Sequence, residues 1–142
     1  MILVDANLLV YAIDRDSPNH RAARHWLEQT LSGPEEVGLP WIVALAFLRL
    51  TTRSSVVRRP LAPEAALSFV DSWLALPNVS LVSPGERHWP IFRGLLQRVG
   101  TAGNLTSDTH LAALAIELGC PVYSTDEDFK RFPGVTHVNP LA

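Results

Sequence analysis

Residues 2–13, ILVDANLLVYAI, place a carboxylate between a short apolar run and a second, longer one. Three aliphatic residues in a row are typical of a strand that is buried on both faces. The run from Leu8 to Ile13 has the length of a short helix that turns away after Asp5. The chain therefore opens with a strand, a tight turn and a helix.

The same alternation continues through the rest of the chain. Helices are predicted where apolar residues recur at helical spacing between glycine and proline breakers, in residues 18–31, 41–52, 63–74, 83–100 and 108–118, with a loop at 100–107. Short apolar runs predict further strands at 37–39, 79–82, 121–124 and 135–138. Strands alternating with helices indicate a mostly parallel sheet covered on both faces, so the expected fold is a three-layer α/β/α sandwich.

Length and composition bound the kind of protein. With 142 residues, of which 47% are apolar and 18% charged, the chain fits a single domain spanning residues 1–142. The formal charge of −2 lacks the basic excess that advertises a nucleic-acid binder, so such binding requires a local patch. One cysteine excludes an internal disulfide, and we find neither a signal peptide nor ~18 consecutive apolar residues. We expect a soluble, cytoplasmic protein.

Three aspartates stand at the boundaries of predicted elements. Asp5 closes the first strand, Asp108 opens a late helix and Asp126 follows a late strand. Ligands of open α/β sheets gather beyond the carboxyl ends of the strands, so these side chains are expected to converge. Aspartate is also a favoured helix cap, but Ser107 and Thr125 are adjacent and would cap equally well. The three together favour a metal site.

Carboxylates in such a cluster suit a hard cation. Mg²⁺ or Mn²⁺ prefers oxygen ligands and keeps waters that phosphate oxygens can replace. Asp128, two residues after Asp126, is a candidate fourth ligand or a supporting group. Asn7 is a candidate hydrogen-bond partner of Asp5 or of a metal-bound water, and Thr125, with Ser124, is a candidate for orienting Asp126.

Other chemistries lack support in the sequence. No serine nucleophile elbow, phosphate-binding loop or dinucleotide fingerprint is present. The five histidines show no zinc-like spacing with the cysteine or with each other. Arg49 and Arg53 belong to a basic stretch that runs from the third helix into the following loop, and their planar side chains suit an RNA backbone, although a solvated surface is the alternative.

Four segments together resemble PIN-domain ribonucleases, and among them the VapC toxins, with similarity to the mycobacterial branch. They are residues 3–7 (LVDAN), 47–49 (FLR), 107–115 (SDTHLAALA) and 124–129 (STDEDF). The resemblance implies a Mg²⁺- or Mn²⁺-dependent endoribonuclease that cleaves tRNA or ribosomal RNA, is frequently a homodimer and is neutralised by a VapB antitoxin. By motif, it makes Asp5, Asp108 and Asp126 the acidic ligands, with Asp128 nearby.

One position departs from the family pattern. The family's second acid is usually a glutamate shortly before the Phe-Leu-Arg segment, where this chain has Ala44, Leu45 and Ala46. The loss removes a negative charge and a metal ligand, and Asp128 is a candidate replacement. Two rivals therefore remain open: a catalytically weak or silent PIN-like protein that binds RNA or antitoxin, and a metal phosphatase acting on small phosphoesters.

Overall fold

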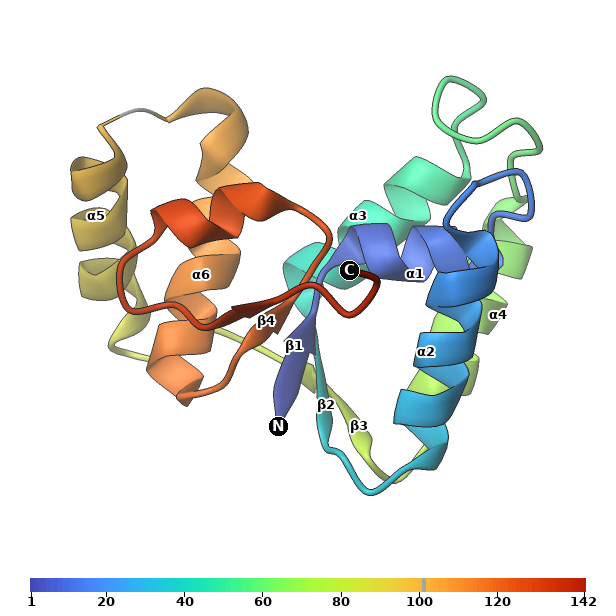
Figure 1. Ribbon diagram of the computed structural model, residues 1–142, viewed down its shortest axis with the longest axis horizontal. Helices are drawn as coiled ribbons and strands as arrows, with labels where there is room; N and C mark the ends of the chain where they lie inside the picture. Colours follow the sequence, from blue (N-terminus) through green and yellow to red (C-terminus); the bar gives the residue numbers. More distant parts are fainter. Residues whose placement is uncertain (101) are drawn as a thin grey trace.

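The computed structural model describes residues 1–100 and 102–142, and its centre is a parallel five-stranded sheet (Figure 1). The strands lie in the order β3-β2-β1-β4-β5. Their bounds are β1 Ile2–Val4, β2 Val37–Pro40, β3 Val79–Val82, β4 Val122–Tyr123 and β5 His137–Val138. All four strand pairs are parallel, so the expectation of a mostly parallel sheet is confirmed.

Helices cover both faces of this sheet. Their bounds are α1 Ala6–Ile13, α2 His20–Ser32, α3 Trp41–Thr51, α4 Pro63–Leu74, α5 His88–Val99 and α6 Thr106–Leu118, with short 3₁₀ turns η1 Gly103–Leu105 and η2 Glu127–Arg131. The chain runs outward from β1 to β3 through α1–α4 and then returns to β4 through α5 and α6. Because crossovers between parallel strands are right-handed, this reversal puts α5 and α6 on the opposite face, as Figure 1 shows. The predicted three-layer α/β/α sandwich is confirmed.

The buried core includes the first strand and the last helix. Leu3 and Val4 on β1 are 0% and 1% exposed, so β1 is the buried centre of the sheet. Ala112, Ala113 and Ala115 are also buried, and these small side chains let α6 approach the sheet closely. Close packing of α6 matters for function because α6 carries Asp108.

Three local predictions need correction. The fifth helix begins at His88 rather than near residue 83, because the Glu117 carboxylate accepts hydrogen bonds from the backbone N–H groups of Gly85 and Arg87 and holds that segment in a turn. The predicted loop at 100–107 contains η1 and the first residues of α6, and Thr101 lies outside the described residues. The last strand is confined to His137–Val138. Within the described part of the chain, no helix has the length and apolarity needed to cross a membrane.

Candidate metal centre

The sheet brings three distant aspartates to one edge. Asp5 follows β1 directly and Asp126 follows β4 after two residues, and these strands are neighbours with Val4 paired to Tyr123. Asp108 lies in the first turn of α6. The convergence expected from the positions of the aspartates at element boundaries is thus present at the carboxyl ends of β1 and β4.

The closest carboxylates are those of Asp108, Asp126 and Asp128. Each offers an oxygen, and these oxygens lie within 4.8 Å of one another, a spacing that could hold one cation. Asp128 is the exposed member, and the other two are half-buried. Asp5 is outside this group of three, but its charge raises the pKa of Asp108, and the charge of Asp126 raises the pKa of Asp5. We call these four residues the acidic centre.

Ser124 joins the two strand ends that form the acidic centre. Its hydroxyl donates a 2.7 Å hydrogen bond to Oδ2 of Asp5 and accepts one of 2.9 Å from the backbone N–H of Asp126. The side-chain amide of Asn7 donates to the same hydroxyl oxygen at 3.3 Å. Since Ser124 is fully buried, water does not compete for these bonds.

The supporting residues differ in detail from those expected. Asn7 contacts Ser124 rather than Asp5, and its Oδ1 is buried without a hydrogen-bond partner among the described residues. Thr125, proposed to orient Asp126, makes no side-chain hydrogen bond recorded in residues 1–100 and 102–142, whereas its neighbour Ser124 does. A serine that follows a strand and precedes an aspartate by two residues was the available signal.

Asp5 and Asp126 cap helices and also belong to the acidic centre. Oδ1 of Asp5 accepts the N–H of Ala6 at 2.8 Å and caps α1, while Oδ2 is held by Ser124. Oδ1 of Asp126 accepts the N–H of Asp128 at 2.9 Å and caps η2. The caps fix the carboxylates in place and leave the second oxygen of Asp126 free of these bonds.

Burial and the repulsion of neighbouring carboxylates raise the pKa values of Asp5 and Asp108. Burial, followed by the charges of Asp126, Asp5 and Asp128, raises the pKa of Asp108 to about 7. Burial also raises the pKa of Asp5, against the opposing effect of the Ser124 hydrogen bond. A carboxylic acid that titrates near neutrality marks a site where negative charge is crowded and unpaired.

The donor set fits a hard divalent cation. In the described residues, no lysine, arginine or histidine forms an ion pair with Asp5, Asp108, Asp126 or Asp128. Three carboxylate oxygens within 4.8 Å of one another and no protein cation are what Mg²⁺ or Mn²⁺ binding needs. An ion pair that neutralised one of these carboxylates would argue against a metal site, and none is present in the described residues.

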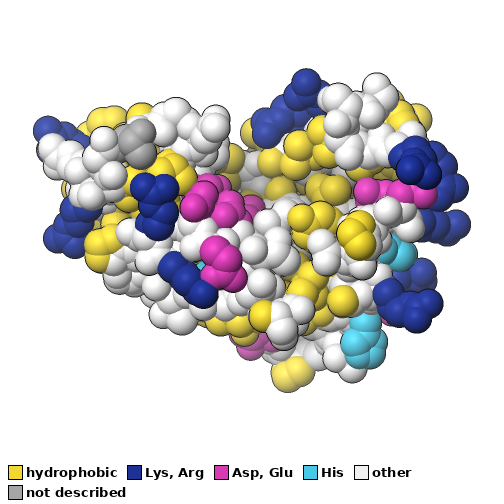
Figure 2. All heavy atoms as spheres, turned by 45° about the horizontal axis from the view of Figure 1, so that its top comes forward, with side chains coloured by type: hydrophobic (Ala, Val, Ile, Leu, Met, Phe, Trp, Pro, Cys, Tyr) yellow, Lys and Arg dark blue, Asp and Glu magenta, His cyan; other side chains and the backbone are white. Residues whose placement is uncertain are grey.

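Basic side chains flank the face onto which the strands open. Figure 2 shows acidic side chains near the middle of this face, beside a hollow, and basic side chains towards its left and right edges. Arg49, in the last turn of α3, and Arg53, just after α3, are both exposed. Neither forms a recorded ion pair among the described residues, so both are available to contact phosphates.

The position of the missing glutamate lies on α3. Ala44 is 5% exposed and Ala46 is half-buried, while Leu45 is 57% exposed and points away from the core. No carboxylate is present on this helix. The acidic centre therefore depends on Asp128 for a further negative charge.

The histidines show no zinc-like spacing in the sequence, yet two of them form a hydrogen bond in the structure. Nε2 of His88, at the start of α5, lies 3.0 Å from Nδ1 of His110 on α6, a hydrogen bond between rings 22 residues apart. Burial lowers the pKa of both histidines, and Glu117 lies 3.9 Å from the other nitrogen of His88. The pair joins α5 to α6, and only the antiparallel packing of these helices could have revealed it.

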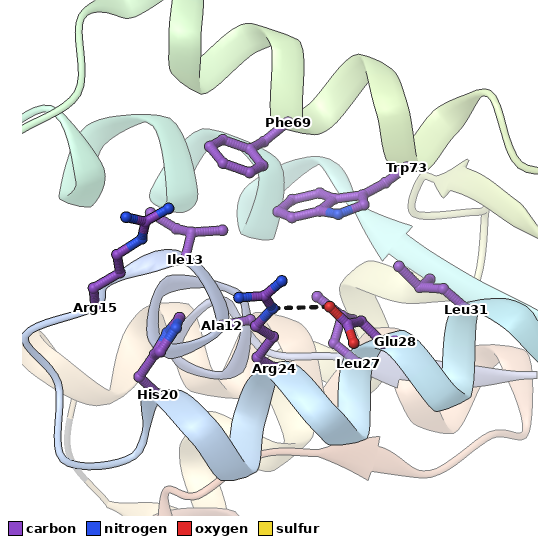
Figure 3. A pocket seen from close by; sticks show the side chains of 10 residues that line it. All are labelled: Ala12, Ile13, Arg15, His20, Arg24, Leu27, Glu28, Leu31, Phe69 and Trp73. Atoms are coloured by element: carbon purple, nitrogen blue, oxygen red, sulfur yellow. Dashed lines mark hydrogen bonds and ion pairs between the residues drawn. The ribbon is translucent and has the colours of Figure 1, made fainter.

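A second concave surface lies away from the acidic centre. A cavity of about 300 Å³ lies between α1, α2 and α4. Figure 3 shows Leu27, Phe69 and Trp73 on its apolar walls. Arg15 and Arg24 line it as well, and Arg24 pairs with Glu28. We call it the α2–α4 groove.

The family of this chain follows from comparison with known proteins. The PIN domain model matches residues 2–135. The chain belongs to the PIN-domain family. It is 46% identical to Ribonuclease VapC37 of Mycobacterium tuberculosis over 142 residues, which cover 100% of this chain and 99% of the relative. Ribonuclease VapC33 of the same species is 41% identical and covers 99% of both chains. The resemblance to VapC proteins of the mycobacterial branch is thus confirmed.

Solved PIN-domain structures share the fold at lower identity. VapBC2 from Rickettsia felis, bound to a DNA fragment from its promoter, matches with a TM-score of 0.68 and 23% identity, covering 98% of both chains. Mycobacterium tuberculosis VapC20, a sarcin-ricin loop cleaving toxin, matches with a TM-score of 0.66 and 20% identity, covering 96% of this chain and 99% of that one. These matches support the architecture of the sheet and its helices.

Proposed function

We propose that this PIN-domain chain is a VapC-type endoribonuclease toxin whose acidic centre binds Mg²⁺ or Mn²⁺ and cleaves an RNA phosphodiester bond. The observation that carries the proposal is that oxygens of Asp108, Asp126 and Asp128 converge within 4.8 Å while these residues form no ion pair within residues 1–100 and 102–142. The relatives named as VapC ribonucleases supply the reaction class. Transfer RNA or ribosomal RNA is the proposed substrate, and the cytoplasm the proposed compartment.

The chemistry divides between the cation and the side chains. A bound divalent ion lowers the pKa of water and neutralises charge that develops on phosphate oxygens. Asp108, Asp126 and Asp128 would hold that ion, and Asp5 would serve as a further acidic group beside it. Ser124 and Asn7 orient Asp5 and the Asp126 segment, while Arg49 and Arg53 would hold the RNA backbone on the outside of the hollow.

Metal titration tests the centre directly. Calorimetric titration with Mn²⁺ is expected to give submillimolar binding that Asp126→Asn abolishes, together with divalent-dependent RNA cleavage that Asp5→Asn and Asp108→Asn remove. Cleavage that survives in both of these folded variants would reject the nuclease assignment. Cleavage of a chromogenic phosphate ester with intact RNA left uncut would instead favour the phosphatase.

The alternative function, a catalytically weak or silent PIN-like protein, is supported by the missing acid on α3. Ala44, Leu45 and Ala46 supply no acid where the family pattern has one. Mn²⁺ binding without RNA cleavage, or no Mn²⁺ binding at all, would favour this module that binds RNA or antitoxin. Asp128 favours the active enzyme because it supplies a carboxylate within reach of Asp108 and Asp126.

The proposed partner is a VapB-type antitoxin. Solved structures of similar fold include VapBC complexes from Rickettsia felis and Salmonella typhimurium. The α2–α4 groove has the apolar walls and basic rim that an amphipathic helix with acidic side chains would fit. A small reading frame immediately upstream of the gene would identify the candidate antitoxin.

A homodimer is also proposed, and exposed apolar side chains on α3 support it. Trp41 is 52% exposed and Leu45 57% exposed, on the same face of the helix at a spacing of four residues. Phe47 and Trp73, by contrast, are core residues that contact each other edge to face. Sedimentation of the chain with and without a Leu45→Lys substitution tests the dimer.

A further inference from the structure

One histidine contacts the segment that carries Ser124 and Asp126. Nε2 of His137, on β5, donates a 2.8 Å hydrogen bond to the backbone carbonyl oxygen of Ser124. A carbonyl oxygen only accepts, so the proton must be on Nε2. The ring also packs beside Phe129, with centroids 6.0 Å apart.

Both main-chain polar groups of Ser124 are bound to the segment that contains β5. Its N–H donates to the carbonyl oxygen of Val138 at 3.0 Å, and its carbonyl accepts from His137. Its hydroxyl meanwhile contacts Asp5 and the Asp126 segment. Ser124 therefore links the sheet edge to the acidic centre through every polar group that it has.

The side chain of His137 supplies a bond that the backbone cannot. Tyr123 pairs with Val138, so in a regular parallel ladder the carbonyl of Ser124 would accept from the N–H of residue 140. Residue 140 is Pro140, which has no N–H. A buried carbonyl without a donor is costly, and His137 is the donor present.

This bond also fixes a direction. The peptide unit that joins Ser124 to Thr125 is planar, so a hydrogen bond at the carbonyl orients the whole unit, including the N–H of Thr125. The chain leaves β4 through that unit and reaches Asp126 one residue later. Rotation of the unit would move Asp126 relative to Asp108 and Asp128.

We propose that His137 is a positioning residue of the acidic centre, because it replaces the hydrogen bond that Pro140 withholds and so holds Ser124 and Asp126 in the geometry that binds the cation. The inference rests on the proposed metal-dependent function. His137 acts through Ser124 and does not contact the carboxylates of the centre.

Three variants and one control test the role. His137→Phe keeps a ring beside Phe129 but removes the donor, and a fall of about tenfold in Mn²⁺ affinity is expected, in the range found when groups behind metal ligands are lost. His137→Gln retains an amide donor and is expected to bind Mn²⁺ within about threefold of the unmodified chain. Val135→Ala, nearby in the sequence, controls for simple loss of packing.

Pro140→Ala provides a rescue that a purely structural role would not show. It restores a backbone N–H at residue 140, so the double variant His137→Phe, Pro140→Ala is expected to recover Mn²⁺ affinity. Calorimetry on the purified chain measures affinity without relying on cleavage, and thermal unfolding shows whether each variant is folded.

Each outcome has a defined meaning. A folded His137→Phe variant that binds Mn²⁺ as tightly as the unmodified chain overturns the positioning role and leaves the proposed function standing. A His137→Gln variant that binds as weakly as the Phe variant, or a Val135→Ala control that weakens binding equally, also overturns it. If the unmodified chain binds no Mn²⁺, the proposed function fails and the role of His137 fails with it.

Discussion

The hydroxyl of Ser124 lies 2.7 Å from Oδ2 of Asp5, although 119 positions separate the two residues. The contact exists because β1 and β4 are adjacent parallel strands that end at the same edge. It makes the acidic centre a product of the complete sheet rather than of any one segment.

Replacing Ser124 by alanine is expected to weaken the centre more than any change at Thr125. Ser124→Ala leaves Oδ2 of Asp5 and the N–H of Asp126 without their partner, which should cost about 1–3 kcal/mol of stability. Mn²⁺ affinity should fall about tenfold. Thr125→Val is the matched control, and calorimetry with thermal unfolding measures both. Equal losses in the two variants would assign the supporting role to Thr125 as well.

Removing the charge of Asp108 is expected to stabilise the metal-free chain. The folded-state pKa of about 7 exceeds the ordinary aspartate value of 3.8, so ionisation disfavours the folded state, and stability should decline as pH rises from about 4 to 7. After allowance for solvent screening of this half-buried group, Asp108→Asn should gain about 1 kcal/mol at pH 8.

Thermal unfolding of metal-free protein at pH 5 and pH 8 measures this gain, which corresponds to about 3 °C in Tm. Asp71→Asn removes an exposed carboxylate on α4 and serves as the control, with no comparable gain expected. A lower Tm for Asp108→Asn at pH 8 would show that Asp108 is stabilised by a partner instead of repelled by its neighbours.

Binding of Mn²⁺ is expected to release protons near neutral pH. Since the pKa of Asp108 is raised to about 7, part of the population is protonated at pH 6.5 and must lose that proton to bind a cation. Apparent binding enthalpies measured at pH 6.5 in two buffers of different ionisation enthalpy should differ. The size of the difference should correspond to the release of about half a proton per ion or more. At pH 8.5 the difference should nearly vanish, and pH-independent proton release would contradict the raised pKa.

Charge reversal at Arg49 and Arg53 is expected to weaken RNA binding without loss of Mn²⁺ affinity. Each contact with a phosphate contributes to the salt dependence of binding, and the slope for single-stranded RNA should fall by about 0.7 per contact removed. Filter binding of RNA to the inactive Asp126→Asn chain over a range of salt concentrations measures this. Arg98→Glu on α5 is the comparison, and an equal effect there would indicate a nonspecific charge response.

A charge change on the wall of the α2–α4 groove should weaken antitoxin binding. Arg24→Glu is expected to raise the Kd for the protein encoded by the upstream reading frame about tenfold, which is about 1.4 kcal/mol. Arg21→Glu lies on the same helix but does not line this cavity. Indistinguishable Kd values for the two variants would place the antitoxin elsewhere on the chain.

The sequence predicted the sheet and most helices because their signals are local. The buried run Ile2–Val4 and the small-residue helix ending before Gly119 mark elements without any tertiary information, and Gly119 adopts the left-handed conformation, φ 67°, that ends α6. The parallel direction of the strands then followed from their alternation with helices. The predicted start of α5 was wrong because it depends on hydrogen bonds from Gly85 and Arg87 to Glu117, which is distant in the sequence.

Candidate metal ligands were also accessible from sequence, since Asp5 and Asp126 each follow a strand. The hydrogen bonds behind them were not, because they depend on side-chain directions after folding. Ser124 rather than Thr125 makes the side-chain hydrogen bonds to Asp5 and to the N–H of Asp126. The hydrogen bond between His88 and His110 joins two helices. Tertiary contacts of this kind leave no periodic trace along the chain.

The reversal of the chain after β3 divides the molecule into two parts that each hold an incomplete set of acids. Residues 1–82 contain Asp5 and Asn7, while residues 83–142 contain Asp108, Ser124, Asp126 and Asp128. A nick in the turn at residues 83–87 would therefore leave Asp5 on one fragment and Asp108, Asp126 and Asp128 on the other. The complete acidic centre therefore forms only when the two parts of the chain are packed against each other along β1 and β4.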